Sequence, residues 1–310
     1  KDINILKYVN KHSKFVSVDK DKISEFLDTI DDWNYHYWLE NENITLNEKE
    51  LIIFAFLCES MNFCFWGNRK WKVNHNGIEY SGSEALFHIL LKAIDSNPHF
   101  LNINYLSHMK KTEFKRIMKS NGQLPPMFTK RFKLLKKTVR IISCKKEKFF
   151  DELFSLNSDE ELLNYIVNNF KYFDDKSKFK GKTINFNKRA ILLTNDLFRL
   201  SQTIHKNIHS VDNLTGGADY ALPRIFEANG ILKYNDKLSR VILNSKMIRH
   251  NSQMEIEIRA NTLYVLELIK EQLQKRHINV NSVELDNIIW NTRNNKNNKR
   301  PYHHTKTIYY

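Results

Sequence analysis

Apolar residues recur at helical spacing along most of the 310-residue chain, and three of these stretches begin with a capping pattern. In that pattern, Ser or Asn is followed three residues later by Glu, so that each side chain can bond the other's backbone N–H at a helix start. It occurs at residues 47–50, 158–161 and 252–255, and the last opens a segment that ends near Arg276. Asn229 with Gly230 is a typical helix stop. The pattern therefore predicts a mainly α-helical protein.

Strand patterns are short and local. Residues 70–73 and 78–80 flank a His-Asn-Gly turn, which predicts at most one short hairpin near residues 70–80. Residues 175–182 are polar and contain a glycine, and we expect an internal loop there. Strands do not alternate with helices, so a doubly wound sheet is not expected. We find no internal repeat and no Gly/Ser linker, and residues 1–310 are predicted to form a single helical domain.

Composition excludes two broad classes of protein. Hydrophobic residues make up 41% of the chain, which is typical of a globular protein and not of a disordered one. The longest apolar run covers residues 51–58, far short of the ~20 residues that a membrane span needs. The N-terminus has no charged-then-apolar leader. We expect an intracellular protein, cytoplasmic or nuclear, without a membrane partner.

Cysteines and histidines offer little support for a metal site. The three cysteines, Cys58, Cys64 and Cys144, are too few and too irregularly spaced for a disulfide framework or a zinc site. His205 and His209 have the spacing that places two imidazoles on one helix face. No glutamate lies between them as in a zincin, and no third ligand is evident. We expect no metal and no organic cofactor.

The formal net charge of +14 leaves two interpretations open. Lys and Arg that neutralise phosphates dominate nucleic-acid binding, so a polyanion-binding face is one of them. The other is a generally solvated surface, because basic residues are spread over residues 110–116, 130–137, 144–148 and 294–300. A phosphorylated nucleotide would also be attracted to such a field.

Residues 214–230, LTGGADYALPRIFEANG, combine a lone carboxylate with the start of a helix. Asp219 lies just before the point where Pro223 favours a helix start. An ionised carboxylate is stabilised at the positive end of a helix and can itself stabilise positive charge that develops on a sugar. The alternative is an N-cap, because Asp is among the preferred capping residues.

Several further segments accompany this one. Together and in this order, they resemble the queuosine salvage protein family, the queuosine 5'-phosphate N-glycosylases, from about Ser13 to the last residue. The segments are NFCFWGNRKW (62–71), YSGSEAL (80–86), FNKRAILLTND (186–196), EIEIRA (255–260), LDNIIWN (285–291) and RPYHHTKTIYY (300–310). The resemblance implies a fold similar to that of helical DNA glycosylases, with two halves packed around one pocket.

The resemblance implies hydrolysis of the bond between ribose and a 7-deazaguanine base, which releases queuine. The ring of this base has carbon in place of N7, so protonation of that atom cannot assist its departure. The sugar side must therefore carry more of the catalysis, and a carboxylate near the anomeric carbon stabilises the oxocarbenium-like state. Asp219 occupies the Asp of the family's FADY motif, and the resemblance makes it the catalytic residue. Gly217 replaces the Phe of that motif, which leaves part of the base-stacking wall to Phe65 or Trp66; both could instead be core residues.

The resemblance implies further substrate contacts. Queuine carries a cationic secondary amine and a diol, so acceptors are expected in its pocket; Asp286 is one, and Asn291 replaces a second Asp of the family, with Trp290 between them. Lys188 follows Asn187, a plausible N-cap, and is expected to bind the phosphate. His36 corresponds to a family histidine, with altered spacing after Trp33. A satisfied surface acid at Asp286 and a solvated helix start at Lys188 are the alternatives.

Two other segments are expected to have structural roles. Glu255 and Arg259 have the i, i+4 spacing of an ion pair on one helix face. The apolar tail at residues 308–310 is expected to pack back onto the body of the protein.

The sequence thus predicts an enzyme whose small-molecule substrate is queuosine 5'-phosphate. A non-catalytic helical module that binds RNA or modified nucleotides is the alternative from another class. A third hypothesis is a glycosylase that flips a base out of a polynucleotide. A polynucleotide binder should lose affinity steeply with salt, whereas a hydrolase that contacts one phosphate should lose little.

Overall fold

The computed structural model describes residues 3–40, 42, 44–67, 69–295, 298 and 300–310. It is mainly helical, with 56% helix and 9% strand, which confirms the predicted fold class. The helices are α1 (Ile3–His12), α2 (Lys22–Leu27), α3 (Glu48–Met61), α4 (Gly82–Ser96), α5 (Ile103–His108), α6 (Lys111–Met118), α7 (Phe128–Lys145), α8 (Glu147–Phe154), α9 (Asp159–Asn169), α10 (Lys188–Leu200), α11 (Gln202–Asn207), α12 (Ala221–Ala228), α13 (Asp236–Leu243), α14 (Gln253–Lys275) and α15 (Ser282–Asn291), with 3₁₀ turns at Lys171–Phe173 and Thr292–Asn294.

Helix boundaries agree with the capping patterns. Asn47 and Glu50 exchange side-chain-to-backbone bonds at the start of α3, while Ser158 and Ser252 accept from the third residue of α9 and of α14. α14 ends at Lys275, and α12 ends directly before Asn229. These ends form as predicted because caps depend on residues that are close in sequence.

Six short strands pair into three two-stranded antiparallel sheets. They are β1 (Val16–Val18) with β6 (Leu232–Tyr234), β2 (Lys72–His75) with β3 (Ile78–Ser81), and β4 (Lys176–Phe179) with β5 (Lys182–Asn185). The β2–β3 hairpin confirms the one predicted near residues 70–80. The limit to one hairpin was wrong, and so was the loop at 175–182, where Lys180 and Gly181 both have positive φ and form the tight turn of a second hairpin.

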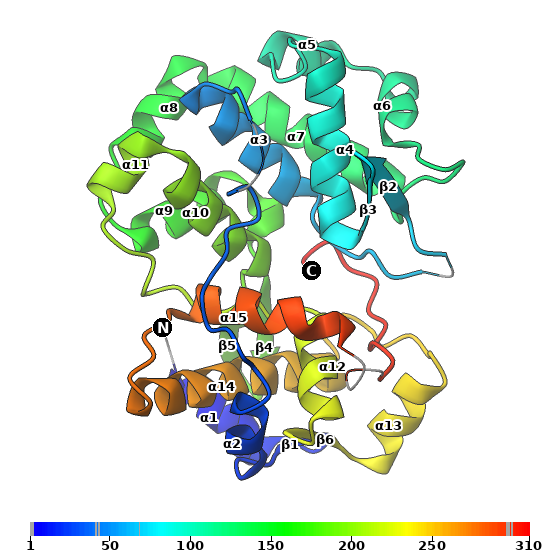
Figure 1. Ribbon diagram of the computed structural model, residues 1–310, viewed down its shortest axis with the longest axis vertical. Helices are drawn as coiled ribbons and strands as arrows, with labels where there is room; N and C mark the ends of the chain where they lie inside the picture. Colours follow the sequence, from blue (N-terminus) through cyan, green and yellow to red (C-terminus); the bar gives the residue numbers. More distant parts are fainter. Residues whose placement is uncertain (1–2, 41, 43, 68, 296–297, 299) are drawn as a thin grey trace.

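Two hydrophobic clusters divide the molecule into an upper and a lower half (Figure 1). The upper half contains α3 to α11 with the β2–β3 hairpin, and its core is built around α3 and α10. The lower half contains α1, α2 and α12 to α15 with the other two sheets, packed around the long α14. α15 lies along the boundary between the halves, and the C-terminal segment runs from the lower half to the centre of the view.

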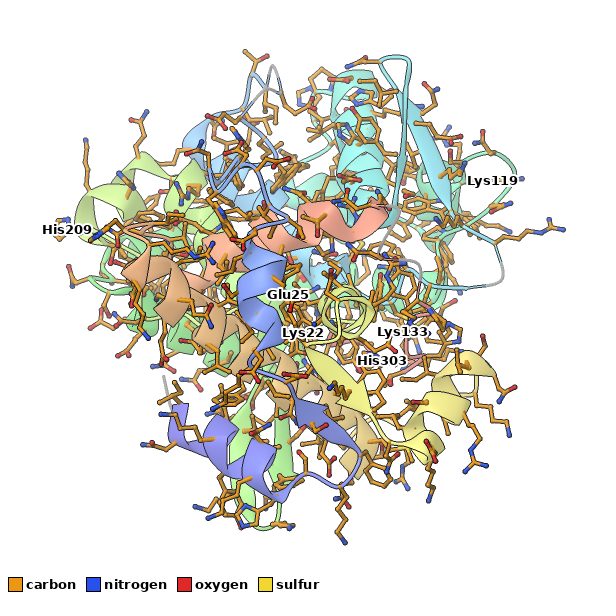
Figure 2. All side chains as sticks on the ribbon, turned by 60° about the horizontal axis from the view of Figure 1, so that its bottom comes forward. Lys22, Glu25, Lys119, Lys133, His209 and His303 are labelled. Carbon is orange, nitrogen blue, oxygen red and sulfur yellow. The ribbon has the colours of Figure 1, made fainter. Side chains whose placement is uncertain are left out.

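Charged side chains are spread over the periphery. Figure 2 shows Lys119 and His209 at opposite edges, and Lys22 with Glu25 on α2 between them. Several lysines are held in ion pairs, as Lys22 is with Glu25 at 2.8 Å and Lys233 with Asp19 at 2.7 Å. Cys58 and Cys64 are buried free thiols and Cys144 is an exposed one. Among the described residues, no helix is long and apolar enough to cross a membrane.

Candidate active site

A cavity of about 660 Å³ opens between the two halves of the molecule. Its upper wall comes from α3, α10 and the segment around α4, and its lower wall from the start of α12 and from α15. Elements of both halves therefore contribute to one pocket. Of the residues that the sequence predicts for the site, His36, Trp66, Lys188, Asp219, Asp286, Trp290 and Asn291 line this cavity.

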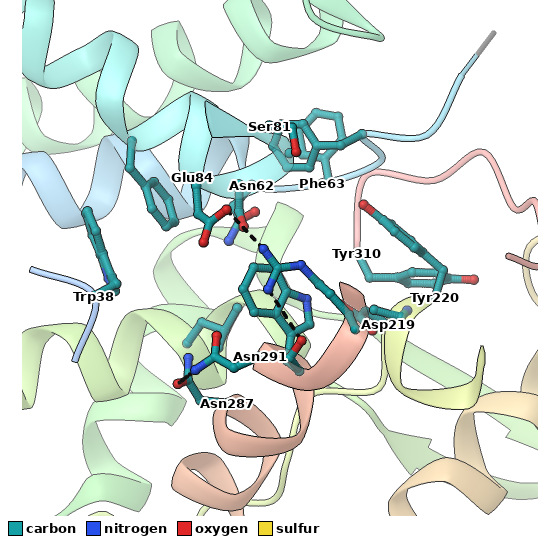
Figure 3. A pocket seen from close by; sticks show the side chains of 18 of the residues that line it. Trp38, Asn62, Phe63, Ser81, Glu84, Asp219, Tyr220, Asn287, Asn291 and Tyr310 are labelled. Atoms are coloured by element: carbon teal, nitrogen blue, oxygen red, sulfur yellow. Dashed lines mark hydrogen bonds and ion pairs between the residues drawn. The ribbon is translucent and has the colours of Figure 1, made fainter. Parts of the chain in front are cut away.

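Asp219 caps α12 and also lines the cavity. Its Oδ1 accepts backbone N–H bonds from Ala221 at 2.7 Å and Leu222 at 3.2 Å, so it caps α12 although it lies one residue before the helix boundary. Its Oδ2 lies 3.2 Å from Nζ of Lys188. The side chain is only 6% exposed, and this residue lines the cavity (Figure 3). The cap thus fixes the carboxylate in place while the other oxygen remains for chemistry.

Lys188 is the first residue of α10, as predicted, and its ammonium contacts the Asp219 carboxylate. Asn187 was expected to cap this helix but does not: it has a φ of 45°, and its Oδ1 accepts the backbone N–H of Asp175 instead. Arg189 does not share the site, because its guanidinium donates to the carbonyls of Glu59, Ser60 and Tyr172 in the core. Lys188 is therefore the cation next to the catalytic candidate.

Asp286 lies on α15 close to both residues. Its Oδ2 accepts the backbone N–H of Gly217 at 2.6 Å, and burial together with the nearby Asp219 charge raises the pKa of Asp286 to about 7. The alternative of a surface acid is wrong, because Asp286 is only 6% exposed and lines the cavity. A carboxyl group with this pKa can accept or donate a hydrogen bond at neutral pH.

Gly217 is absent from the residues that line the cavity. A Cβ there would lie 2.7 Å from Cγ of Lys188 and 3.0 Å from Oδ2 of Asp286. The position behind these two side chains has no room for a ring, and its backbone N–H holds Asp286 in place. Gly217 thus lies behind the cavity wall and positions Asp286. We predicted that it contacts the substrate, but it does not line this cavity.

The exposed end of α15 forms another part of the wall. Arg293 lies over the Trp290 ring, with its Cζ 3.2 Å from the centroid, and binds Glu84 of the upper half at 3.0 Å. This ion pair crosses from one half to the other. Asn291 is exposed, and its Nδ2 donates to Oδ1 of Asn287 at 3.2 Å (Figure 3). Asp286 and Asn291 do face the same cavity despite their five-residue separation, Asp286 in the interior and Asn291 at the rim.

Aromatic walls come from both halves. Trp66 stacks on His304 with ring centroids 4.5 Å apart, and Phe65 also lines the cavity, with the guanidinium of Arg131 4.3 Å from its ring centroid. His36 lies at the rim, where its side chain is 65% exposed and 3.5 Å from Asp32. These three residues are thus placed where a ring of the substrate can reach them.

Sequence reasoning missed a second set of acids on the upper wall. Lys188, Leu192, Asn195 and Asp196 form one cavity-facing stripe of α10, and Glu59 of α3 lies beside it. Burial raises the pKa of Asp196 to about 7 and of Glu59 to about 8. The available indications were a charged residue directly after the apolar run of α3 and an Asp two turns after Lys188 in α10.

The Asp219 loop is held from behind by the predicted ion pair on α14. Arg259 lies 3.5 Å from Glu255, donates to Ala218 O at 3.1 Å, and contacts Asp175 at 2.5 Å. The predicted packing of the C-terminal tail is confirmed as well, since the buried Tyr310 donates from its hydroxyl to Glu255 at 2.9 Å. α11 ends at Asn207, so His205 and His209 do not share a helix. The described residues contain no group of three or more potential metal ligands.

Comparison with known proteins gives a consistent result. Residues 41–310 match the family model described as queuosine salvage protein. A Mus musculus protein named queuosine 5'-phosphate N-glycosylase/hydrolase is 28% identical over 98% of this chain and 97% of its own length. Proteins of the same name from Sphaerobacter thermophilus and Nematostella vectensis are 24% and 26% identical, and each covers more than nine-tenths of both chains.

Proposed function

Because the chain belongs to the queuosine salvage protein family, we propose that it hydrolyses the N-glycosidic bond of queuosine 5'-phosphate and releases queuine. Water adds to the anomeric carbon, the bond from that carbon to the base breaks, and the base leaves with a proton. The observation that carries this proposal is the buried Asp219 carboxylate, which faces a cavity large enough for a nucleotide and has one oxygen that makes no capping bond.

Asp219 is the group that acts on the sugar. The oxocarbenium-like state carries positive charge at the anomeric carbon, and a fixed, buried carboxylate stabilises that charge more strongly than water does. Capping by Ala221 and Leu222 restricts the carboxylate to one orientation, so little reorganisation is needed when the charge develops. The C–N bond that breaks would therefore lie over Oδ2.

Asp286 and Lys188 both lie near the Asp219 carboxylate. Asp286 is assigned to the polar edge of the base, which offers both donors and acceptors, because a carboxyl with a pKa of about 7 can serve either. Lys188 keeps its assignment to the 5'-phosphate, although its ammonium also contacts Asp219. Trp66, Trp290 and the rim residues His36 and Asn291 complete the substrate contacts.

The cavity has more acids than cations. Among the residues that the structure describes, it is lined by three bases, Lys70, Lys188 and Arg293, and by six acids, which are Glu42, Glu59, Glu84, Asp196, Asp219 and Asp286. This balance is opposite to that of the whole chain, with its net charge of +14. An acidic cavity favours a ligand with a cationic arm, and it disfavours a polynucleotide threaded through it because of its many phosphates.

Further parts of the proposal concern the protein as a whole. Both halves are proposed to act as one domain, since the walls of a single cavity come from both. The free thiols fit an intracellular location, cytoplasmic or nuclear. The chemistry assigned to Asp219 is hydrolysis that needs no metal or organic cofactor.

Incubation with queuosine 5'-phosphate and chromatographic detection of free queuine tests the proposal. Release of queuine that depends on the folded protein supports it. A folded protein that releases none, but binds RNA with an affinity that falls steeply with salt, would instead support the binding-module alternative.

A further inference from the structure

Glu59 and Asp196 form a second acidic locus in the cavity, separate from Asp219. They are 1% and 5% exposed, and both line the cavity. Neither is within ion-pair distance of a cation among the residues that the structure describes. Their hydrogen bonds come from neutral groups: Asn62 donates to Glu59 at 3.0 and 3.1 Å, and the Tyr37 hydroxyl donates to Asp196 at 3.1 Å. Lys188 and Arg189 attract the Glu59 carboxylate only from a longer distance. Burial favours the protonated form of both acids, and a cationic ligand would favour the ionised form.

α10 places this locus at a defined distance from the catalytic one. Lys188, beside Asp219, and Asp196 lie on the same cavity-facing stripe, eight residues apart. At 1.5 Å per residue, their backbone positions are about 12 Å apart. Tyr37, which donates to Asp196, adjoins Trp38, and Figure 3 shows Trp38 and Asp219 on opposite sides of the cavity. Asp196 therefore lies well away from the point where the glycosidic bond breaks, and Glu59 is close enough to both Asp196 and Lys188 for their charges to act on it.

The proposed substrate has a positive charge that can reach toward this locus. In queuosine the secondary amine is five bonds from the anomeric carbon, a contour length of about 7.5 Å at ~1.5 Å per bond, and the cyclopentene diol extends farther. With the anomeric carbon over Asp219, an arm directed along α10 brings the ammonium and the diol toward Glu59 and Asp196. The arm's charge and the distance along α10 therefore match the position of the acids.

We propose that Asp196, supported by Tyr37 and paired with Glu59, is the specificity determinant that binds the ammonium and diol of the queuine side arm. This inference rests on the proposed function, because it takes queuosine 5'-phosphate as the substrate. It divides recognition between two places: Asp286 contacts the ring of the base near the sugar, and Asp196 contacts the arm. The raised pKa values of Asp196 and Glu59 agree with a cation-binding pair that carries no cation before the ligand arrives.

The test compares two free bases that differ only in the arm. Queuine and 7-deazaguanine are titrated by calorimetry into the parent protein, Asp196→Asn and Tyr37→Phe. The parent should bind queuine more tightly than 7-deazaguanine. Asp196→Asn should weaken queuine binding by roughly ten- to hundredfold, as for the loss of a charge-assisted hydrogen bond, and leave 7-deazaguanine binding almost unchanged. Tyr37→Phe should cause a smaller loss in the same direction.

The matched control is Asp159→Asn, which removes a buried carboxylate that does not line the cavity. It should leave the ratio of the two affinities as in the parent. Asp196→Asn removes a buried acid and should fold. If this variant does not fold, the queuine affinity of Tyr37→Phe tests the proposal.

Three outcomes would overturn the proposal. They are a parent with no preference for queuine, equal losses for the two bases, and queuine binding that is unchanged in both variants. Hydrolysis of queuosine 5'-phosphate is measured separately on the parent. A parent that discriminates between the bases but never cleaves the nucleotide would refute the proposed function and leave the arm-binding assignment standing.

Discussion

Replacing Asp219 by Asn separates the two contacts that its carboxylate makes. Oδ1 accepts from Ala221 and Leu222, and an Asn oxygen can take over both bonds. Oδ2 faces the Lys188 ammonium at 3.2 Å, and the Asn amide that replaces it is a donor and carries no charge. The variant therefore keeps the cap but loses the negative charge that the transition state requires.

The two losses have different expected sizes. Asp and Asn cap helices about equally well, so the cap itself should change stability by only a few tenths of a kcal/mol. A buried cation left without its partner can cost about 3 kcal/mol or more, but Asp286 lies close enough to Lys188 to replace part of the lost attraction. The loss of one main electrostatic stabiliser should lower kcat by about a hundred- to a thousandfold, or about 2.7 to 4 kcal/mol.

The assay measures kcat, KM, queuine affinity and Tm for the same variant. Because only interactions that strengthen in the transition state lower the chemical barrier, kcat should fall while queuine affinity changes little. Asp159→Asn is the matched control, since Asp159 is also buried and accepts backbone N–H bonds, from Glu160 and Asn213, but does not line the cavity. An Asp219→Asn variant that is stable, binds queuine and turns over as fast as the parent refutes the catalytic assignment.

Three more perturbations address the surrounding residues. Lys188→Gln should lower kcat and reduce the preference for the 5'-phosphate over the bare nucleoside by roughly 1.5 to 3 kcal/mol, because the ammonium that contacts the phosphate is lost. Kinetics on both substrates measure this preference, and an unchanged value rules out the phosphate contact. Gly217→Ala should lower kcat/KM and cost about 1 to 3 kcal/mol in denaturant unfolding, because its Cβ would collide with Lys188 and crowd Asp286; parental stability and activity would contradict the tight fit. Asp286→Asn should raise Tm near pH 8 and have little effect on Tm near pH 4. Between pH 4 and 7 the folded state keeps the Asp286 proton and the unfolded state releases it, so this group destabilises the fold as pH rises through that window. If the Tm of Asp286→Asn differs from that of the parent by the same amount at both pH values, the pKa of Asp286 is not raised. Calorimetry on the same variant should record weaker queuine binding.

Features that depend on neighbours in sequence were predictable from the sequence. The capped starts of α3, α9 and α14 and the Asn76-Gly77 turn of the β2–β3 hairpin require only residues within about one turn of each other. The Glu255–Arg259 pair belongs to the same group, because a helix brings i and i+4 together wherever it forms. The turn at Lys180 was missed because Lys rarely adopts positive φ.

The resemblance of ordered segments predicted several of the residues that line the cavity, but not how they interact. Lys188 precedes Asp219 by 31 positions in the sequence and Asp286 follows it by 67, and nothing local states that they meet. Gly217 appeared to be a missing wall of the pocket, whereas packing places it behind Lys188 and Asp286, where only a glycine fits.

Only the tertiary structure determined the environment of the acids. Asp196 and Glu59 are 137 positions apart in the sequence, and as residue types they are the same as the exposed acids elsewhere in the chain. Packing α3 against α10 buries both beside one cavity, and the loss of water raises their pKa values. The sequence by itself determined the helices and the chemical types available, because these depend on local backbone geometry and composition. Burial and the distances between charges depend on which helices pack together, and so the tertiary structure decided which carboxyl groups face a substrate.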